Sequence, residues 1–149
     1  MFYCHTFITN SSSTSFIAVG VSLHRDRAES IFKHLVKSCS AEELLDRYNR
    51  NYGRANKENF LKDPESYILR ELSGILGALG TCLPEGVYLE CPPYDLFYMC
   101  IGYPGFYLTA DGIVVLEDPE ELKKGFHNLK KLLTELGIND HIDVVSDGV

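Results

Sequence analysis

The chain has 149 residues, of which 45% are hydrophobic and 23% are charged. This composition is ordinary for a globular protein, and the length suits one domain, so we expect a single domain over residues 1–149 with its own core. No stretch is long and apolar enough to cross a bilayer, and the first residues lack the basic and apolar regions of a secretory signal. We therefore expect a cytoplasmic protein that does not associate with membranes.

The net charge of −7 is unevenly distributed along the chain. Residues 1–62 hold nine Lys and Arg against six Asp and Glu, a net +3, whereas residues 63–149 hold five against fifteen, a net −10. This asymmetry predicts a basic patch and an acidic surface on one molecule, which would permit a homo-oligomer. An acidic protein binds nucleic acid poorly unless its basic residues converge, so we expect a protein partner rather than nucleic acid.

The five cysteines are odd in number and match no recognised disulfide framework. Cys82, Cys91 and Cys100 follow one another at intervals of nine residues. Structural zinc sites instead use pairs about two to four residues apart. We expect reduced thiols, no metal site and no cofactor.

Two apolar runs, Phe2–Ile8 and Phe16–Leu23, flank the polar stretch Thr9–Ser15. Short hydroxyl and amide side chains bond to their own backbone and favour turns, so the sequence predicts an N-terminal β-hairpin. Both runs are apolar on both faces, which is typical of central strands covered on two sides.

Helical periodicity begins with an apolar stripe over Ala28–Lys37. Ser40 and Glu43 have the spacing of a capping box, which predicts a second helix from Ala41. A third helix is predicted from the Asp63-Pro64 pair, with an apolar stripe that ends at Gly80. Glycines recur every third residue near its end, so we expect a close backbone contact there.

The second half of the sequence predicts four short strands, one helix and a final strand. Short apolar runs predict strands over Val87–Cys91, Leu96–Ile101, Phe106–Thr109, Ile113–Glu117 and His141–Val145. Asp111-Gly112 lies between two of these runs and predicts a hairpin turn. Asp118-Pro119 repeats the helix-start pattern, and Gly137 predicts the end of that helix. Its apolar stripe, expected to face the core, consists of Leu122, Phe126, Leu129, Leu133 and Leu136. The fold class is therefore α+β: a mixed, mostly antiparallel sheet opened by the hairpin, with about four helices packed on it.

The serine-rich turn is one candidate site, because hydroxyls and turn amides can bind a phosphate or an oxyanion. A catalytic serine among Ser11, Ser12 and Ser13 would need a base, and His5 and His24 are the nearest histidines in sequence. No Gly-x-Ser-x-Gly elbow or phosphate-loop lysine accompanies them. A turn that bonds only to itself is the structural alternative.

This stretch also carries a resemblance. Residues Phe7–Ile17 resemble the opening of many uncharacterised small proteins of bacteria, archaea and their phages. Those proteins begin with a short strand, then Thr or Ser, Asn, a serine run and Phe-Ile or Phe-Val. Thr14 interrupts the serine run here. The resemblance implies a prokaryotic or viral origin, and it carries no activity.

A basic stripe is the second candidate site, with cations at steps of three, four and three residues and two tyrosines beside them. Its members are Arg47, Arg50, Arg54, Lys57, Tyr48 and Tyr52. On one helix face, guanidinium groups would bind phosphate or carboxylate, and tyrosines would stack on bases. A solvated helix face is the alternative.

Two functions follow from these features. The first is a non-enzymatic binding protein, encoded by a prokaryote or phage, that acts through a protein–protein surface and could inhibit a host factor. The alternative is a small hydrolase or transferase acting on a phosphorylated or nucleotide-like substrate. In that alternative the serine turn and the basic stripe would bind the anion, with His5 or His24 as base.

Overall fold

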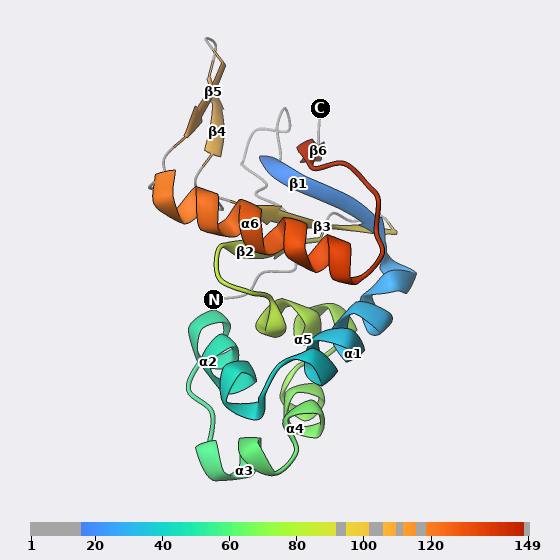
Figure 1. Cartoon of the computed structure of the whole chain (residues 1–149), viewed down its shortest axis with the longest axis vertical. Coiled ribbons are helices and arrows are strands. Elements are labelled where there is room, and N and C mark those ends of the chain that lie inside the picture. The colour runs from blue at the N-terminus through green and yellow to red at the C-terminus, as the bar shows by residue number, and fades with distance from the viewer. Residues whose placement is uncertain (1–15, 92–94, 102–105, 110–111, 116–118, 148–149) are drawn as a thin grey trace. The chain divides into compact units, whose positions relative to one another are not determined.

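The computed structural model of the chain describes residues 16–91, 95–101, 106–109, 112–115 and 119–147 (Figure 1). These residues divide into two compact units. A helical unit contains Arg25–Leu83, and a sheet unit contains the described residues before Arg25 and after Leu83. The first strand and the serine turn of the expected N-terminal hairpin lie outside the described residues. The expectation of a single domain stays a prediction.

The sheet unit contains a four-stranded antiparallel sheet with the order β2-β3-β1-β6. Its strands are β1 (Phe16–His24), β2 (Val87–Glu90), β3 (Leu96–Ile101) and β6 (Asp143–Asp147). β1 pairs with β3 on one side and with β6 on the other, which confirms the prediction that this strand is central. A mixed sheet also needs parallel pairs, and none occurs among the described strands.

A separate two-stranded ladder joins β4 (Phe106–Thr109) to β5 (Gly112–Val115). Their antiparallel pairing confirms the predicted hairpin. Gly112 was expected in the turn, but it pairs with Thr109 and is the first residue of β5.

Helix α6 (Pro119–Glu135) packs against β2 and β3 (Figure 1). It buries Leu129 and Leu133, which belong to its predicted apolar stripe, and also Leu132, which does not. Gly137 follows it with φ of 69°, a conformation that favours glycine and ends the helix as predicted. Phe126 was expected to point into the core, but its side chain is 43% exposed.

The helical unit contains a 3₁₀ turn, η1 (Arg25–Arg27), and five α-helices. These are α1 (Ala28–Ser38), α2 (Ala41–Asn51), α3 (Lys57–Lys62), α4 (Pro64–Glu71) and α5 (Ile75–Cys82). With α6, the described residues hold six α-helices rather than about four. The difference comes from α3, which periodicity did not predict, and from a break in the predicted third helix.

Side-chain caps define three of these helix starts. Ser40 accepts a hydrogen bond from the Glu43 amide at 3.1 Å, and Asp63 accepts one from the Ser66 amide at 3.2 Å. Both caps were predicted from local sequence. Asn56 caps α3 in the same way, and this signal was missed because α3 has only six residues.

The predicted helix from Pro64 to Gly80 is in fact two helices. Leu72 is extended with ψ of 142°, and Gly74 is extended with φ of 175°. Glycine and serine are poor helix formers, so Ser73-Gly74 lets the chain leave the helix at low cost. The expected close backbone contact is wrong for Gly74, which has no neighbouring atom within 4 Å of an added Cβ. At Gly77 the neighbour is the Leu72 side chain instead.

Of the four cysteines in the described ranges, one departs from the expectation of reduced thiols. Cys82 and Cys100 are buried thiols, and Cys39 is a partly exposed one. Burial raises the pKa of Cys82 to about 12 and also raises the pKa of Cys100. Cys91 is disulfide-bonded, so the expectation is wrong there. Because neutral thiols are weak nucleophiles, Cys82 and Cys100 are core residues rather than reactive groups.

Candidate functional site

The predicted basic stripe does not form one helix face. α2 ends at Asn51, Arg54 lies in the connection to α3, and Lys57 is the first residue of α3. The helix that would have aligned the four cations is therefore interrupted, and the prediction of one shared helix face is wrong.

Two of the stripe's arginines bind backbone carbonyls at the end of α5. Arg47 donates from Nη1 to the Cys82 carbonyl at 2.8 Å, and Arg50 donates from Nη2 to the Leu83 carbonyl at 3.3 Å. Asn51 donates to the Thr81 carbonyl at 3.2 Å. The last carbonyls of a helix lack partners within it, and cations are favourable there. These side chains therefore stabilise the α2–α5 contact.

The two tyrosines of the stripe have different environments. Tyr48 is 3% exposed, and its ring centroid lies 5.4 Å from that of Phe60 and 5.8 Å from that of Tyr67. Burial, with a smaller contribution from Tyr67, raises the pKa of Tyr48 to about 12. Tyr48 is thus a core residue of the helical unit, whereas Tyr52 is 50% exposed.

This arrangement predicts a stability effect at Arg47. Replacing Arg47 with Leu leaves the Cys82 carbonyl without that donor, so we expect the free energy of unfolding to fall by about 2 kcal/mol. Urea denaturation followed by circular dichroism measures the change. Glu43→Gln is the matched control, because it removes only the exposed partner of the Arg47 ion pair and should change stability by less than about 0.5 kcal/mol. Equal effects of the two variants would contradict the role of the carbonyl bond.

The serine-turn site is not assembled by the described part of the chain. Ser11, Ser12, Ser13 and His5 lie outside the described residues, and His24 is exposed at the end of β1. The catalytic reading of these residues stays a prediction.

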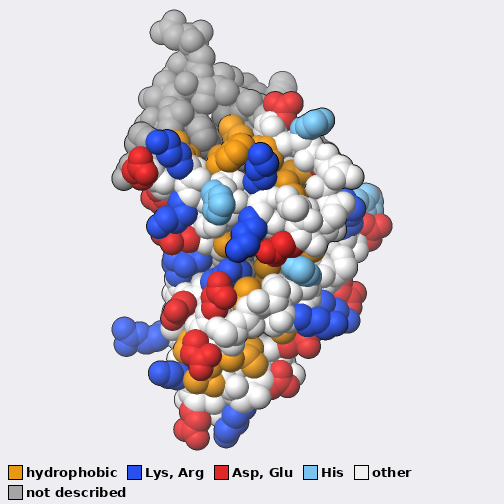
Figure 2. Space-filling view, in the orientation of Figure 1, with side chains coloured by type: hydrophobic (Ala, Val, Ile, Leu, Met, Phe, Trp, Pro, Cys, Tyr) orange, Lys and Arg blue, Asp and Glu red, His pale blue; other side chains and the backbone are white. Residues whose placement is uncertain are grey.

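A basic surface occurs where the charge distribution predicted an acidic one. Residues 84–149 contain four Lys and no Arg against twelve Asp and Glu. All four lysines lie on α6 and are exposed: Lys123, Lys124, Lys130 and Lys131. Figure 2 shows blue side chains gathered over α6 with hydrophobic surface beside them. Sequence reasoning missed this surface, although two Lys-Lys pairs seven residues apart must share one helix face.

The lysines differ in their ion pairs. Lys123 lies 3.5 Å from Glu120, and Lys124 lies 3.4 Å from Glu85. Within the described residues, Lys130 and Lys131 form no ion pair. Exposed ion pairs contribute about 0–1 kcal/mol, so even the paired lysines exchange partners at little cost.

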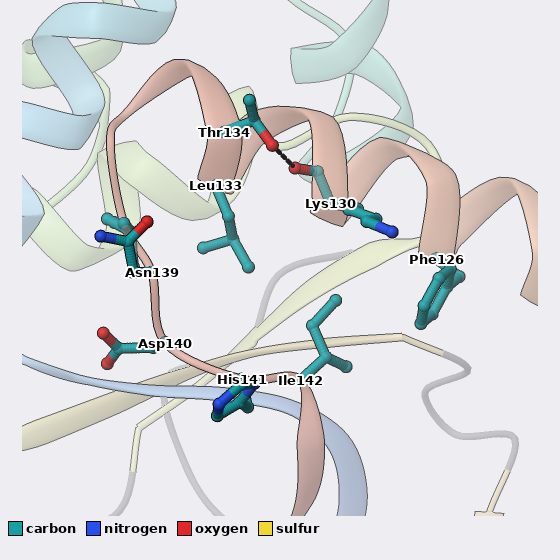
Figure 3. Close-up of a pocket in the computed structure, with 9 residues that line it drawn as sticks. Phe126, Lys130, Leu133, Thr134, Asn139, Asp140, His141 and Ile142 are labelled. Carbon is teal, nitrogen blue, oxygen red and sulfur yellow. Dashed lines mark hydrogen bonds between the residues drawn. The ribbon is translucent and has the colours of Figure 1, made fainter.

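A partly apolar pocket of about 300 Å³ adjoins Lys130. It lies between the C-terminal half of α6 and the segment that leads into β6 (Figure 3). The lining residues are Phe126, Lys130, Leu133, Thr134, Ile138, Asn139, Asp140, His141 and Ile142. In Figure 3, Leu133 points down from α6 toward Ile142, which points up from the opposite side. The pocket thus combines four apolar side chains with five polar or charged ones, among them Lys130.

A second pocket of about 330 Å³ lies in the helical unit between α3 and α4. It is lined by Asn59, Lys62, Asp63, Ser66, Tyr67 and Arg70. Several of its polar groups bind one another: Ser66 Oγ donates to Asp63 at 2.8 Å, and the Arg70 guanidinium lies 5.3 Å from the centroid of the Tyr67 ring. The Ser66 hydrogen bonds also lower the pKa of Asp63. This pocket therefore offers fewer unengaged groups than the pocket beside α6.

Two further observations bear on function. No group of three or more His, Cys, Asp or Glu that could hold a metal ion occurs within the described ranges. None of the helices in those ranges is long and apolar enough to span a membrane.

Comparison with protein-family models, with curated proteins and with solved structures finds no match to this chain.

Proposed function

We propose that the chain is a non-enzymatic binding protein that acts through a protein–protein surface on α6. This α6 surface consists of the exposed side chains Phe126, His127, Lys130 and Lys131, with the adjoining pocket. The observation that carries the proposal is the concentration of every lysine of residues 84–149 on this one helix, next to a partly apolar pocket.

One feature of the α6 surface is typical of protein interfaces, namely the exposed aromatic ring of Phe126. An exposed aromatic ring at the edge of a partly apolar pocket supplies contact area, and surrounding charges set orientation and association rate. Phe126 is one of the large hydrophobic side chains that the described residues leave exposed. A helix that served only to cover the sheet would gain no stability from exposing this ring.

The enzymatic alternative has lost part of its support. It required the basic stripe to bind an anionic substrate, but Arg47 and Arg50 donate to the backbone carbonyls of Cys82 and Leu83. What still supports it is the hydroxyl-rich stretch around Ser11 to Ser13. A thermal-shift screen with nucleotides and inorganic phosphate tests the enzymatic alternative, and stabilisation of the chain by these ligands would favour that alternative.

The biological setting is proposed from the sequence. The resemblance over Phe7–Ile17 supports a prokaryotic or phage origin. If a phage encodes the chain, the proposed role is inhibition of a host factor by binding to it. A cytoplasmic location and self-association rest on composition and charge. Light scattering during size-exclusion chromatography tests self-association, and a monomer at all concentrations would remove it.

Affinity capture with matched charge variants tests the proposed function. The full chain, a Lys130→Glu/Lys131→Glu variant and a Lys33→Glu/Lys37→Glu control on α1 would each be immobilised and exposed to lysate of the organism that encodes the chain. All four substituted lysines are exposed, so the variants should fold alike. We expect at least one protein to be retained by the wild type and the control but not by the α6 variant. Identical retention by all three would refute an α6 interface.

A further inference from the structure

The geometry of the α6 surface points to its occupant: a short acidic segment of a partner protein that places a bulky apolar side chain in the pocket. This inference rests on the proposed function and adds the chemistry of the partner.

The size of the pocket favours a single side chain. Its volume of about 300 Å³ is at the low end of the roughly 300–1,000 Å³ of pockets that enclose a drug-sized ligand. Leu133 is 4% exposed and Ile138 is 8% exposed, so both belong to the wall rather than to the rim. In Figure 3 the Phe126 ring stands at one end of the space, where it can cover an inserted side chain. Leu, Ile or Phe from a partner fits this environment.

The lysines favour acidic residues on either side of the apolar side chain that the partner inserts. Lys130 lines the pocket, and Lys131 and His127 continue the exposed side of α6. From Lys123 to Lys131 the helix rises about 12 Å, a length that about four extended residues of a peptide cover. Carboxylates on either side of the apolar residue can therefore reach ammonium groups at the same time. Asp140 lies on the opposite side of the pocket and disfavours a second run of acidic residues there.

The charge of the sheet unit favours a short acidic peptide over nucleic acid. Residues 84–149 contain twelve Asp and Glu in addition to the four lysines. A nucleic acid has a phosphate about every 1.7 Å of duplex and extends beyond α6 into this negative field. A short acidic segment stays close to the lysines of α6 and meets fewer of these carboxylates than a duplex does, because screening limits exposed charges to about 8 Å at physiological salt.

Fluorescence anisotropy with designed peptides tests the inference. The probe is a fluorescein-labelled peptide in which Glu and Asp flank a central Leu-Phe pair. One control peptide replaces Leu-Phe with Ser-Ser, and the other replaces the acidic residues with Gln and Asn. The protein variants are Lys130→Glu/Lys131→Glu, Phe126→Ser and the Lys33→Glu/Lys37→Glu control, each checked for folding by circular dichroism.

We expect the acidic Leu-Phe peptide to bind the wild type and the α1 control equally. Its dissociation constant should rise at least about tenfold with either α6 variant, and similarly with either control peptide. Equal binding of the Ser-Ser peptide, or tighter binding of a single-stranded oligonucleotide, would overturn the inference.

The two proposals fail in different ways. If the acidic peptide does not bind while lysate capture still depends on Lys130 and Lys131, the partner chemistry is wrong and the α6 interface stands. If capture is also independent of these lysines, both proposals are wrong.

Discussion

Replacing Gly20 with Ala should lower the free energy of unfolding by about 3 kcal/mol, because no space exists for a side chain between β1 and β3. A Cβ atom at Gly20 would lie 2.1 Å from the Met99 carbonyl oxygen and 2.8 Å from the Cys100 Cα. Both are backbone atoms of a paired strand, and Gly20 also pairs with Asp143 on the other side. Movement away from β3 therefore disturbs the pairing with β6.

Urea denaturation of the full chain, followed by circular dichroism, measures this loss. Gly53→Ala is the control, since no atom lies within 4 Å of its added Cβ and its backbone is not in the left-handed region. It should change stability by less than about 0.5 kcal/mol. A Gly20→Ala protein with the denaturation midpoint of the wild type would show that the two strands are not in close contact.

Replacing Gly125 with Ala should destabilise the protein by about 2 to 3 kcal/mol, although the same change in an open helix stabilises by up to about 1 kcal/mol. A Cβ at Gly125 would lie 2.5 Å from the carbonyl oxygen of Gly86. The segment before β2 is held there, because Asn128 donates to the Glu85 carbonyl at 2.8 Å. Gly86 itself has φ of 82°, which favours glycine.

Gly77→Ala in α5 is the matched control for this second prediction. Its nearest neighbour is the Leu72 Cδ1 atom at 3.3 Å, the end of a side chain that can shift. We expect that variant to be neutral or slightly stabilising. The Gly86→Ala/Gly125→Ala double variant should lose less stability than the sum of the single variants, because both force the same two backbones apart. A stabilising Gly125→Ala change would place α6 farther from Gly86 than described.

Local sequence predicted the elements whose signals lie within a few residues of one another. Ser40 with Glu43, and Asp63 before Pro64, identified two helix starts because a cap and its amide are three residues apart. The strand over Phe16–Leu23 was predicted as central because both of its faces are apolar, and its pairing with β3 and β6 confirms this. Short features were missed: neither the six-residue helix α3 nor the break between α4 and α5 at Gly74 was predicted.

The candidate site depended on contacts between residues far apart in sequence. Arg47 was predicted to bind an anion, but its partner is a carbonyl 35 residues away, which helical periodicity alone could not identify. The pocket likewise forms only because the segment from Ile138 to Ile142 returns beside α6.

By itself, the sequence determined the α+β composition, most helix starts and the course of β1, because caps, turns and periodicity depend on neighbouring residues. It also sets the seven-residue spacing that places the two lysine pairs on one side of α6, although the basic surface there was not predicted. Only the tertiary structure decided which cations are engaged by carbonyls, why Gly20 and Gly125 admit no side chain, and which apolar groups meet beside Lys130. Those outcomes are set by the packing of distant segments, where the partner of a side chain is chosen by geometry rather than by its place in the sequence.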